Sequence, residues 1–125
     1  MSNILVGARC NGCRETHMMS GDQRGPVQCP RCKQTFPAKD TGEVFFNCGN
    51  ELAGKSDFTQ AIDVYTTAIH YNPQDKEAYN NRGLCHGSLG NHAAAIRDYD
   101  EVLRIDPRYE DAAFNRGLAV RGERP

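Results

Sequence analysis

The chain of 125 residues and 13.9 kDa has room for one ordinary domain or two very small ones, which excludes the large catalytic folds. Its mean hydropathy of -0.68, with 38% hydrophobic and 25% charged residues, indicates a soluble protein that is neither disordered by composition nor embedded in a bilayer. The net charge of -1 hides an asymmetry, since residues 1–40 are basic and residues 41–125 are acidic. The start of the chain has neither a basic lead nor a long apolar stretch, which predicts a cytoplasmic protein.

Four of the six cysteines form two C-x2-C pairs, Cys10 with Cys13 and Cys29 with Cys32. Because the export signal that a secreted disulfide framework would need is missing, we interpret these cysteines as metal ligands in a reducing compartment. Two tight turns that supply four thiolates give zinc a closed tetrahedral site. We therefore expect a small β zinc ribbon over residues 1–40 that holds one structural Zn²⁺, its only cofactor.

Other readings of these sulfurs stay open. The same four thiolates could bind iron, or the two pairs could act as redox-active dithiols, although neither pair opens a helix of a βαβ unit. His17 could replace one thiolate, but four cysteines already complete the coordination. A nucleic-acid-associated ribbon, related to transcription or translation, is a further alternative. Phe36 is the only aromatic residue in this part, so no stacking platform for single strands is present.

A resemblance supports the metal reading. The run Arg24-Gly25-Pro26-Val27-Gln28-Cys29-Pro30-Arg31-Cys32 resembles the second knuckle of the zinc ribbons that open many multi-domain bacterial proteins. Arg24 and Lys33 depart from the usual pattern around the glycine and after the last cysteine. All four ligand positions match, so the resemblance implies a structural zinc ion.

The rest of the chain is an internal repeat, in which residues 45–78 align with residues 79–112. We call the constant separation between aligned residues the repeat interval. The identities between the two copies are Asn47/Asn81, Gly49/Gly83, Ala61/Ala95, Ile62/Ile96, Tyr65/Tyr99, Pro73/Pro107 and Ala78/Ala112, and Asn81-Arg82-Gly83-Leu84 recurs as Asn115-Arg116-Gly117-Leu118. Apolar residues at steps of three and four predict amphipathic helices near residues 44–54, 58–71, 78–88, 92–105 and 112–121. Asp63, Arg97 and Asp98 are expected on the outer faces of these helices.

The repeat interval resembles the period of the tetratricopeptide repeat family. The resemblance implies a mainly α fold over residues 41–125. It consists of antiparallel helical pairs at about 42–75 and 76–109, followed by a capping helix at about 110–122. A short linker, Lys39 to Glu43, would join the helices to the ribbon. In each pair a glycine lets the two helices approach closely, and a tyrosine fills the space between pairs.

In that family the first helices of the units line a concave groove. The corresponding residues here are Phe46, Asn47, Asn50, Gly54, Asn80, Asn81, Leu84, Ser88, Phe114, Asn115, Leu118 and Arg121. From these we predict a peptide-binding site made of Asn47, Asn50, Asn80, Asn81, Leu84, Phe114, Asn115 and Arg121. An amide can bond both the N–H and the C=O of an extended peptide, although asparagines that merely bond within the helical surface are an equal alternative.

Some members of that family hold the C-terminal carboxylate of heat-shock chaperones with two asparagines and three basic residues. Asn50 and Asn81 match the two asparagines, but Phe46, Asp111 and Asn115 occupy the basic positions. The carboxylate clamp is therefore incomplete, which disfavours binding of a chaperone tail.

No constellation in the sequence is typical of an enzyme. Cys48 and Cys85 are expected to be buried and inert, and no histidine has a catalytic partner at a repeated spacing. We therefore predict a non-enzymatic adaptor that binds a protein or peptide and does not contact membranes. Apolar residues on the last helix (Phe114, Leu118 and Val120) also suggest weak homodimerisation through that helix.

Overall fold

The computed structural model describes residues 5–9, 16–20 and 38–125, with side chains from residue 41 onwards. Two antiparallel strands, β1 (Leu5–Arg9) and β2 (Thr16–Ser20), pair with Leu5 opposite Ser20. Five helices follow: α1 (Ala38–Gly54), α2 (Phe58–Tyr71), α3 (Lys76–Ser88), α4 (His92–Ile105) and α5 (Glu110–Val120). All five predicted helices are confirmed. The four predicted zinc ligands lie outside the described residues, so the zinc ribbon stays a prediction.

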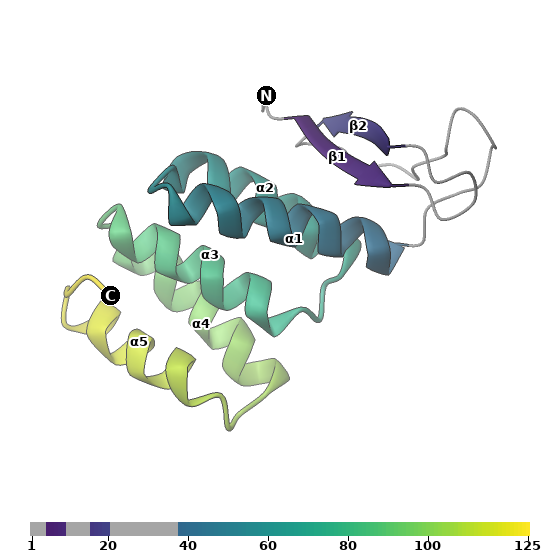
Figure 1. Ribbon diagram of the computed structural model, residues 1–125. Helices are drawn as coiled ribbons and strands as arrows, with labels where there is room; N and C mark the ends of the chain where they lie inside the picture. The colour runs from purple at the N-terminus through teal and green to yellow at the C-terminus, as the bar shows by residue number, and fades with distance from the viewer. Residues whose placement is uncertain (1–4, 10–15, 21–37) are drawn as a thin grey trace.

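The helices form two layers, with α1, α3 and α5 in front and α2 and α4 behind them (Figure 1). α1 packs on α2 as unit 1, and α3 packs on α4 as unit 2. α2 contacts α3 and α4 contacts α5, so the units stack in chain order, while β1 lies against α1. This arrangement confirms the predicted helical pairs with a single helix at the end.

α1 is longer than predicted, and the expected linker is wrong because residues 39–43 belong to the helix. Thr41 and Gly42 are buried. A Cβ built on Gly42 would lie 3.3 Å from the carbonyl oxygen of Ala68, at the end of α2. Contact with α2 therefore extends α1 toward its N-terminus, and the apolar periodicity of the sequence does not show this contact.

Side-chain oxygens cap the N-termini of two of the helices. Asp75 Oδ1 accepts a hydrogen bond from the backbone N–H of Ala78 at 3.2 Å, and Asn91 Oδ1 accepts one from Ala94 at 3.4 Å. These N-caps satisfy N–H groups that have no partner within the helix. Gly90, with a φ of 81°, makes the turn between α3 and α4 in a conformation that other residues rarely adopt.

The closest contact between the paired helices joins a glycine to a tyrosine ring. A Cβ built on Gly49 would lie 2.5 Å from Cε1 of Tyr65, and one on Gly83 would lie 2.7 Å from Cε1 of Tyr99. Both tyrosines are 1% exposed, so their rings have no free space into which to move. The predicted close approach at the two glycines is confirmed, and only glycine fits beneath each ring.

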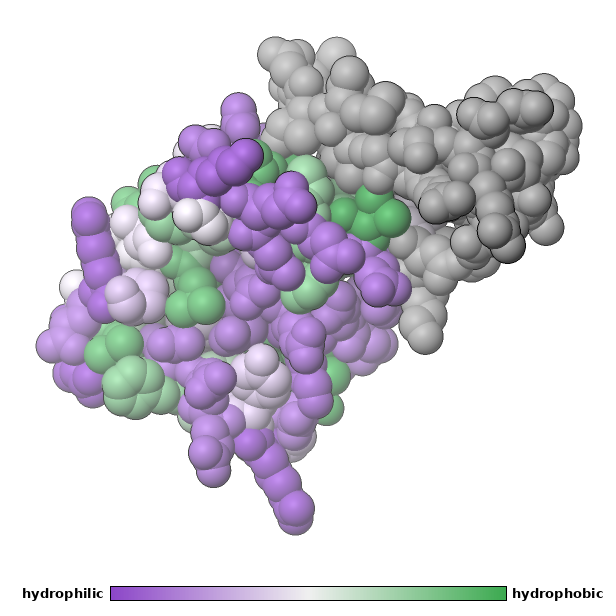
Figure 2. All heavy atoms as spheres, in the orientation of Figure 1, coloured by the Kyte–Doolittle hydropathy of each residue, from purple (hydrophilic) through white to green (hydrophobic). Residues whose placement is uncertain are grey.

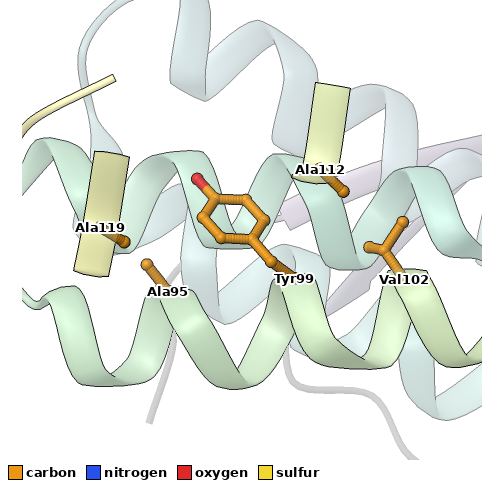
Figure 3. Packing of buried hydrophobic residues seen from close by; sticks show 5 residues of the cluster. All are labelled: Ala95, Tyr99, Val102, Ala112 and Ala119. Carbon is orange, nitrogen blue, oxygen red and sulfur yellow. The ribbon is translucent and has the colours of Figure 1, made fainter. Parts of the chain in front are cut away.

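Each tyrosine also reaches the next first helix in the stack. Tyr65 belongs to the same buried cluster as Cys85 of α3. In Figure 3, the ring of Tyr99 on α4 lies between Ala112 and Ala119 of α5, and the three residues belong to one buried cluster. Cys85 and Ala119 are separated by one repeat interval, so the same contact recurs in the next first helix. The predicted role of the tyrosines between units is confirmed.

Asp98 is not on an outer face as predicted, since it is 5% exposed. The guanidinium of Arg82 donates two hydrogen bonds to it, Nη2 to Oδ1 at 2.6 Å and Nε to Oδ2 at 2.9 Å. A third bond runs from Nη1 to Thr66 Oγ1 at 3.1 Å. Arg82 therefore links α3 to α4 and α2, and this pairing lets a carboxylate be buried where the pattern of the sequence places it in solvent.

The pair is specific to unit 2, because Cys48 and Val64 occupy the corresponding positions of unit 1. Arg82→Met leaves the Asp98 carboxylate buried without its partner, and we expect it to lower the free energy of unfolding by about 3–5 kcal/mol. The double variant Arg82→Cys with Asp98→Val, which copies unit 1, should recover most of that loss. Urea unfolding measures both, and a single variant as stable as the unsubstituted chain would contradict the role of the pair.

Candidate functional site

Two rows of polar residues follow the repeat interval along the first helices. Glu43, Glu77 and Asp111 form the carboxylate row, with one residue on each of α1, α3 and α5. Asn47, Asn81 and Asn115 form the amide row, one helical turn further along the same three helices. Side chains one turn apart share a helix face, so each helix presents one carboxylate and one amide on the same side. Glu43, Glu77, Asp111 and Asn47 are exposed, whereas Asn81 and Asn115 are half-buried.

The two rows meet in a hollow on the surface between α1 and α3. The hollow has a volume of about 280 Å³. It is lined by Glu43, Phe46, Asn47, Asn72, Asp75 and Glu77. Three of these six residues have carboxylates and two have amides, so the hollow is acidic, and the ring of Phe46 gives it an apolar wall. Figure 2 shows this side of the molecule, on which hydrophilic residues predominate.

Asn50 and Asn81, two of the predicted groove residues, are brought together. Asn50 Oδ1 accepts hydrogen bonds from the hydroxyl of Tyr65 at 2.6 Å and from Nδ2 of Asn81 at 2.9 Å. The two bonds connect α1 with α2 and with α3. Among the described residues, they use the acceptor of Asn50 and leave its N–H donors and the carbonyl of Asn81 for other partners.

The remaining predicted residues are spread over different surroundings. Asn80 is 5% exposed, and its Oδ1 has no hydrogen-bond partner among the described residues, so its side chain is not at the surface as an open groove would require. Leu84 is half-buried. Phe114 is 67% exposed, and Arg121 is also exposed. Arg121, the C-cap of α5, follows Phe114 by two helical turns, so these two residues share one side of the helix. Asn115 lies on another side.

The two cysteines of the helical region are protected from reaction. Burial raises the pKa of the Cys85 thiol to about 11, and burial with the nearby Glu51 carboxylate raises the pKa of Cys48. Both thiols are therefore protonated at neutral pH, in agreement with the predicted inert role, although Cys48 is only half-buried. Burial lowers the pKa of His86 and outweighs the Asp98 carboxylate 3.9 Å away.

Within the described part of the chain, no three His, Cys, Asp or Glu side chains come together as a metal site would require. The described helices include none with the length and apolar character needed to cross a membrane.

Two features were not predicted from the sequence, the carboxylate row and the pair of Arg82 with Asp98. The row could have been found from the same arithmetic that revealed the repeat, because Glu43, Glu77 and Asp111 are separated by the repeat interval. The third residue is aspartate and the first two are glutamates, so identity between the copies does not reveal Asp111. Arg82 had no such signal, since its partner Asp98 lies on the next helix and has no counterpart in unit 1.

Comparison with known proteins agrees with this geometry. The model of the tetratricopeptide repeat family matches residues 48–110. The chain belongs to the tetratricopeptide repeat family. The first tetratricopeptide unit of Spaghetti (RPAP3), solved with the HSP90 peptide SRMEEVD, has a TM-score of 0.66 over 67% of each chain at 24% sequence identity. This likeness shows the shared fold.

Among curated tetratricopeptide relatives, Hsp70-Hsp90 organizing protein 1 of Glycine max is 33% identical over 55% of this chain. The co-chaperone sgt12 of Aspergillus fumigatus is 31% identical over 80% of the chain. The chain spans only 12% and 29% of these two proteins. The similarity therefore concerns the repeat region and not the whole relatives.

Proposed function

We propose that this tetratricopeptide protein is a non-enzymatic adaptor whose first helices bind an extended, basic segment of another protein. The observation that supports the proposal is the hollow between α1 and α3, where Glu43, Asn47 and Glu77 converge. The amides would hold the backbone of the segment, and the carboxylates would select Lys or Arg side chains. Asp111 and Asn115 repeat the same pair of groups on α5 and would extend the site.

The charge of this face argues against the acidic ligand seen with a similar fold. The HSP90 peptide bound to the first unit of Spaghetti contains two glutamates and ends in aspartate. At the positions that match the basic residues of the chaperone-tail clamp, this chain has Phe46, Asp111 and Asn115. A peptide carboxylate would meet Asp111 and no lysine or arginine at these positions, so we propose that the partner differs from that of the relatives.

A labelled SRMEEVD peptide and its charge-reversed analogue, SRMKKVK with an amidated C-terminus, test the proposal by fluorescence anisotropy. We expect the analogue to bind more tightly. Glu43→Gln with Glu77→Gln should weaken its binding about three- to tenfold, the effect of losing two exposed ion pairs. Asn50→Ala with Asn81→Ala should also weaken it while the helical content stays unchanged.

Asp63→Asn is the matched control, because Asp63 is an exposed carboxylate on α2, in the other layer. It should leave binding unchanged. Tighter binding of SRMEEVD than of the analogue, or equal binding by the Glu43/Glu77 variant and the unsubstituted chain, would refute the proposed selectivity.

We also propose that Cys10, Cys13, Cys29 and Cys32 hold one structural zinc ion. The support is the donor set of four thiolates together with the strand pairing. β1 ends at Arg9 and β2 begins at Thr16, so the first cysteine pair falls in the short connection between two antiparallel strands. The ion would stabilise a segment with few large apolar side chains and would take no part in chemistry.

Elemental analysis of the purified chain should find one zinc per chain. Cys10→Ser with Cys29→Ser should abolish zinc binding, because two of the four thiolates are removed. Cys48→Ser, the matched control in α1, should retain the metal. Bound iron, or a chain that contains no metal, would contradict the proposal.

A further inference from the structure

α5 repeats the first helix of a unit, but no second helix covers it within residues 38–125. Ala113, Gly117 and Val120 of α5 stand one repeat interval after Tyr79, Gly83 and His86 of α3, which are buried or half-buried in unit 2. On α5 the two outer members of this set, Ala113 and Val120, are exposed. The helix therefore presents to solvent a face that is packed in the preceding unit.

Two large apolar side chains of α5 are exposed. Leu89, Phe114 and Val120 are the large hydrophobic side chains exposed in the described part of the chain, and two of them belong to α5. Phe114 is 67% exposed and Val120 is 60% exposed. In Figure 2, apolar residues are visible over α5 at the lower left. Phe114 is the large apolar side chain of the face that also holds Gly117, and an exposed ring on a small domain favours contact with another surface.

Gly117 leaves a gap in this face. A Cβ built there would lie 3.8 Å from Nη1 of Arg121, its nearest neighbour among the described residues, whereas one built on Gly83 would lie 2.7 Å from the ring of Tyr99. In unit 2 an aromatic ring fills this position. On α5 only the mobile end of the Arg121 side chain lies near this position among the described residues, so the position can accept an aromatic ring from outside.

We propose that the occupant is a second copy of this chain, bound through α5 in an antiparallel, twofold-symmetric pair. Glu110, Phe114, Gly117 and Arg121 follow one another at steps of four, three and four, so they share one face of the helix. An antiparallel pair that places Phe114 of each copy over Gly117 of the other also places Glu110 of each copy opposite Arg121 of the other. The face is therefore complementary to itself in shape and in charge, as a twofold interface requires.

Residues 124 and 125 lie near Gly87 and Gly90, at the end of α3. A Cβ built on Gly87 would lie 3.0 Å from Cδ of Pro125, and one on Gly90 would lie 3.5 Å from Nη2 of Arg124. The last residues thus run along the end of unit 2. Glu123 forms an exposed ion pair with Arg121, Oε2 to Nη2 at 3.3 Å, which solvent screens and which a second copy can replace.

Sedimentation velocity of the full chain in reducing buffer tests the pairing. One helix of 11 residues buries less area than a standard interface, so we expect a weak dimer that forms between about 5 and 500 µM. Glu110→Arg or Arg121→Glu places like charges opposite each other at two symmetric points, and each should weaken dimerisation about tenfold. An equimolar mixture of these two variants should dimerise again, because each variant then supplies the charge that the other needs.

Glu51→Arg, on the exposed face of α1, makes the same charge change as Glu110→Arg and should leave dimerisation unaffected. Gly117→Leu fills the gap and should abolish dimerisation, with the helical content retained. A chain that stays monomeric over the whole concentration range would overturn the proposal. A dimer that persists in both charge variants, or a mixture that fails to dimerise, would overturn it as well.

Discussion

The structure depends on a tyrosine ring packed directly on a glycine. Gly49 lies under Tyr65 in unit 1 and Gly83 under Tyr99 in unit 2, each at a distance that admits no further carbon atom. Each ring also contacts the first helix that follows, so one side chain fixes both the pairing of helices within a unit and the stacking of units. The contact recurs after one repeat interval. Side chains of the first helices that are separated by the same interval therefore lie at equivalent positions along the stack.

Two consequences follow from that recurrence. Carboxylates and amides placed once in a unit return in the next, so a row of each forms along one layer and the two rows meet between α1 and α3. At the far end the recurrence continues in Gly117 of α5, but no ring lies on it within the described residues. The proposed binding face and the proposed self-association surface therefore arise from the same repeat. The first lies on the paired helices of units 1 and 2, and the second lies on α5.

The sequence predicted much of the fold, because glycine, tyrosine and apolar periodicity report packing within and between neighbouring helices. The bounds of α2 and α4 match the prediction. The early start of α1 was not predicted, since it depends on the contact of Gly42 with the end of α2, which the apolar periodicity does not show. Polarity also misplaced Asp98 and Asn80, both 5% exposed. A polar residue is assigned to the surface unless its partner is known, and Arg82 becomes recognisable as such a partner only in three dimensions.

The most direct test of the account compares two glycine substitutions on the same kind of element. In Gly83→Ala the new methyl group meets the buried ring of Tyr99, so urea unfolding should show a loss of about 1–3 kcal/mol in spite of the better helix propensity of alanine. Gly54→Ala, where a Cβ would have no neighbour within 4 Å among the described residues, should be neutral or stabilising by up to about 1 kcal/mol. A Gly83→Ala protein as stable as the Gly54→Ala protein would contradict the central role of the tyrosine on glycine contact.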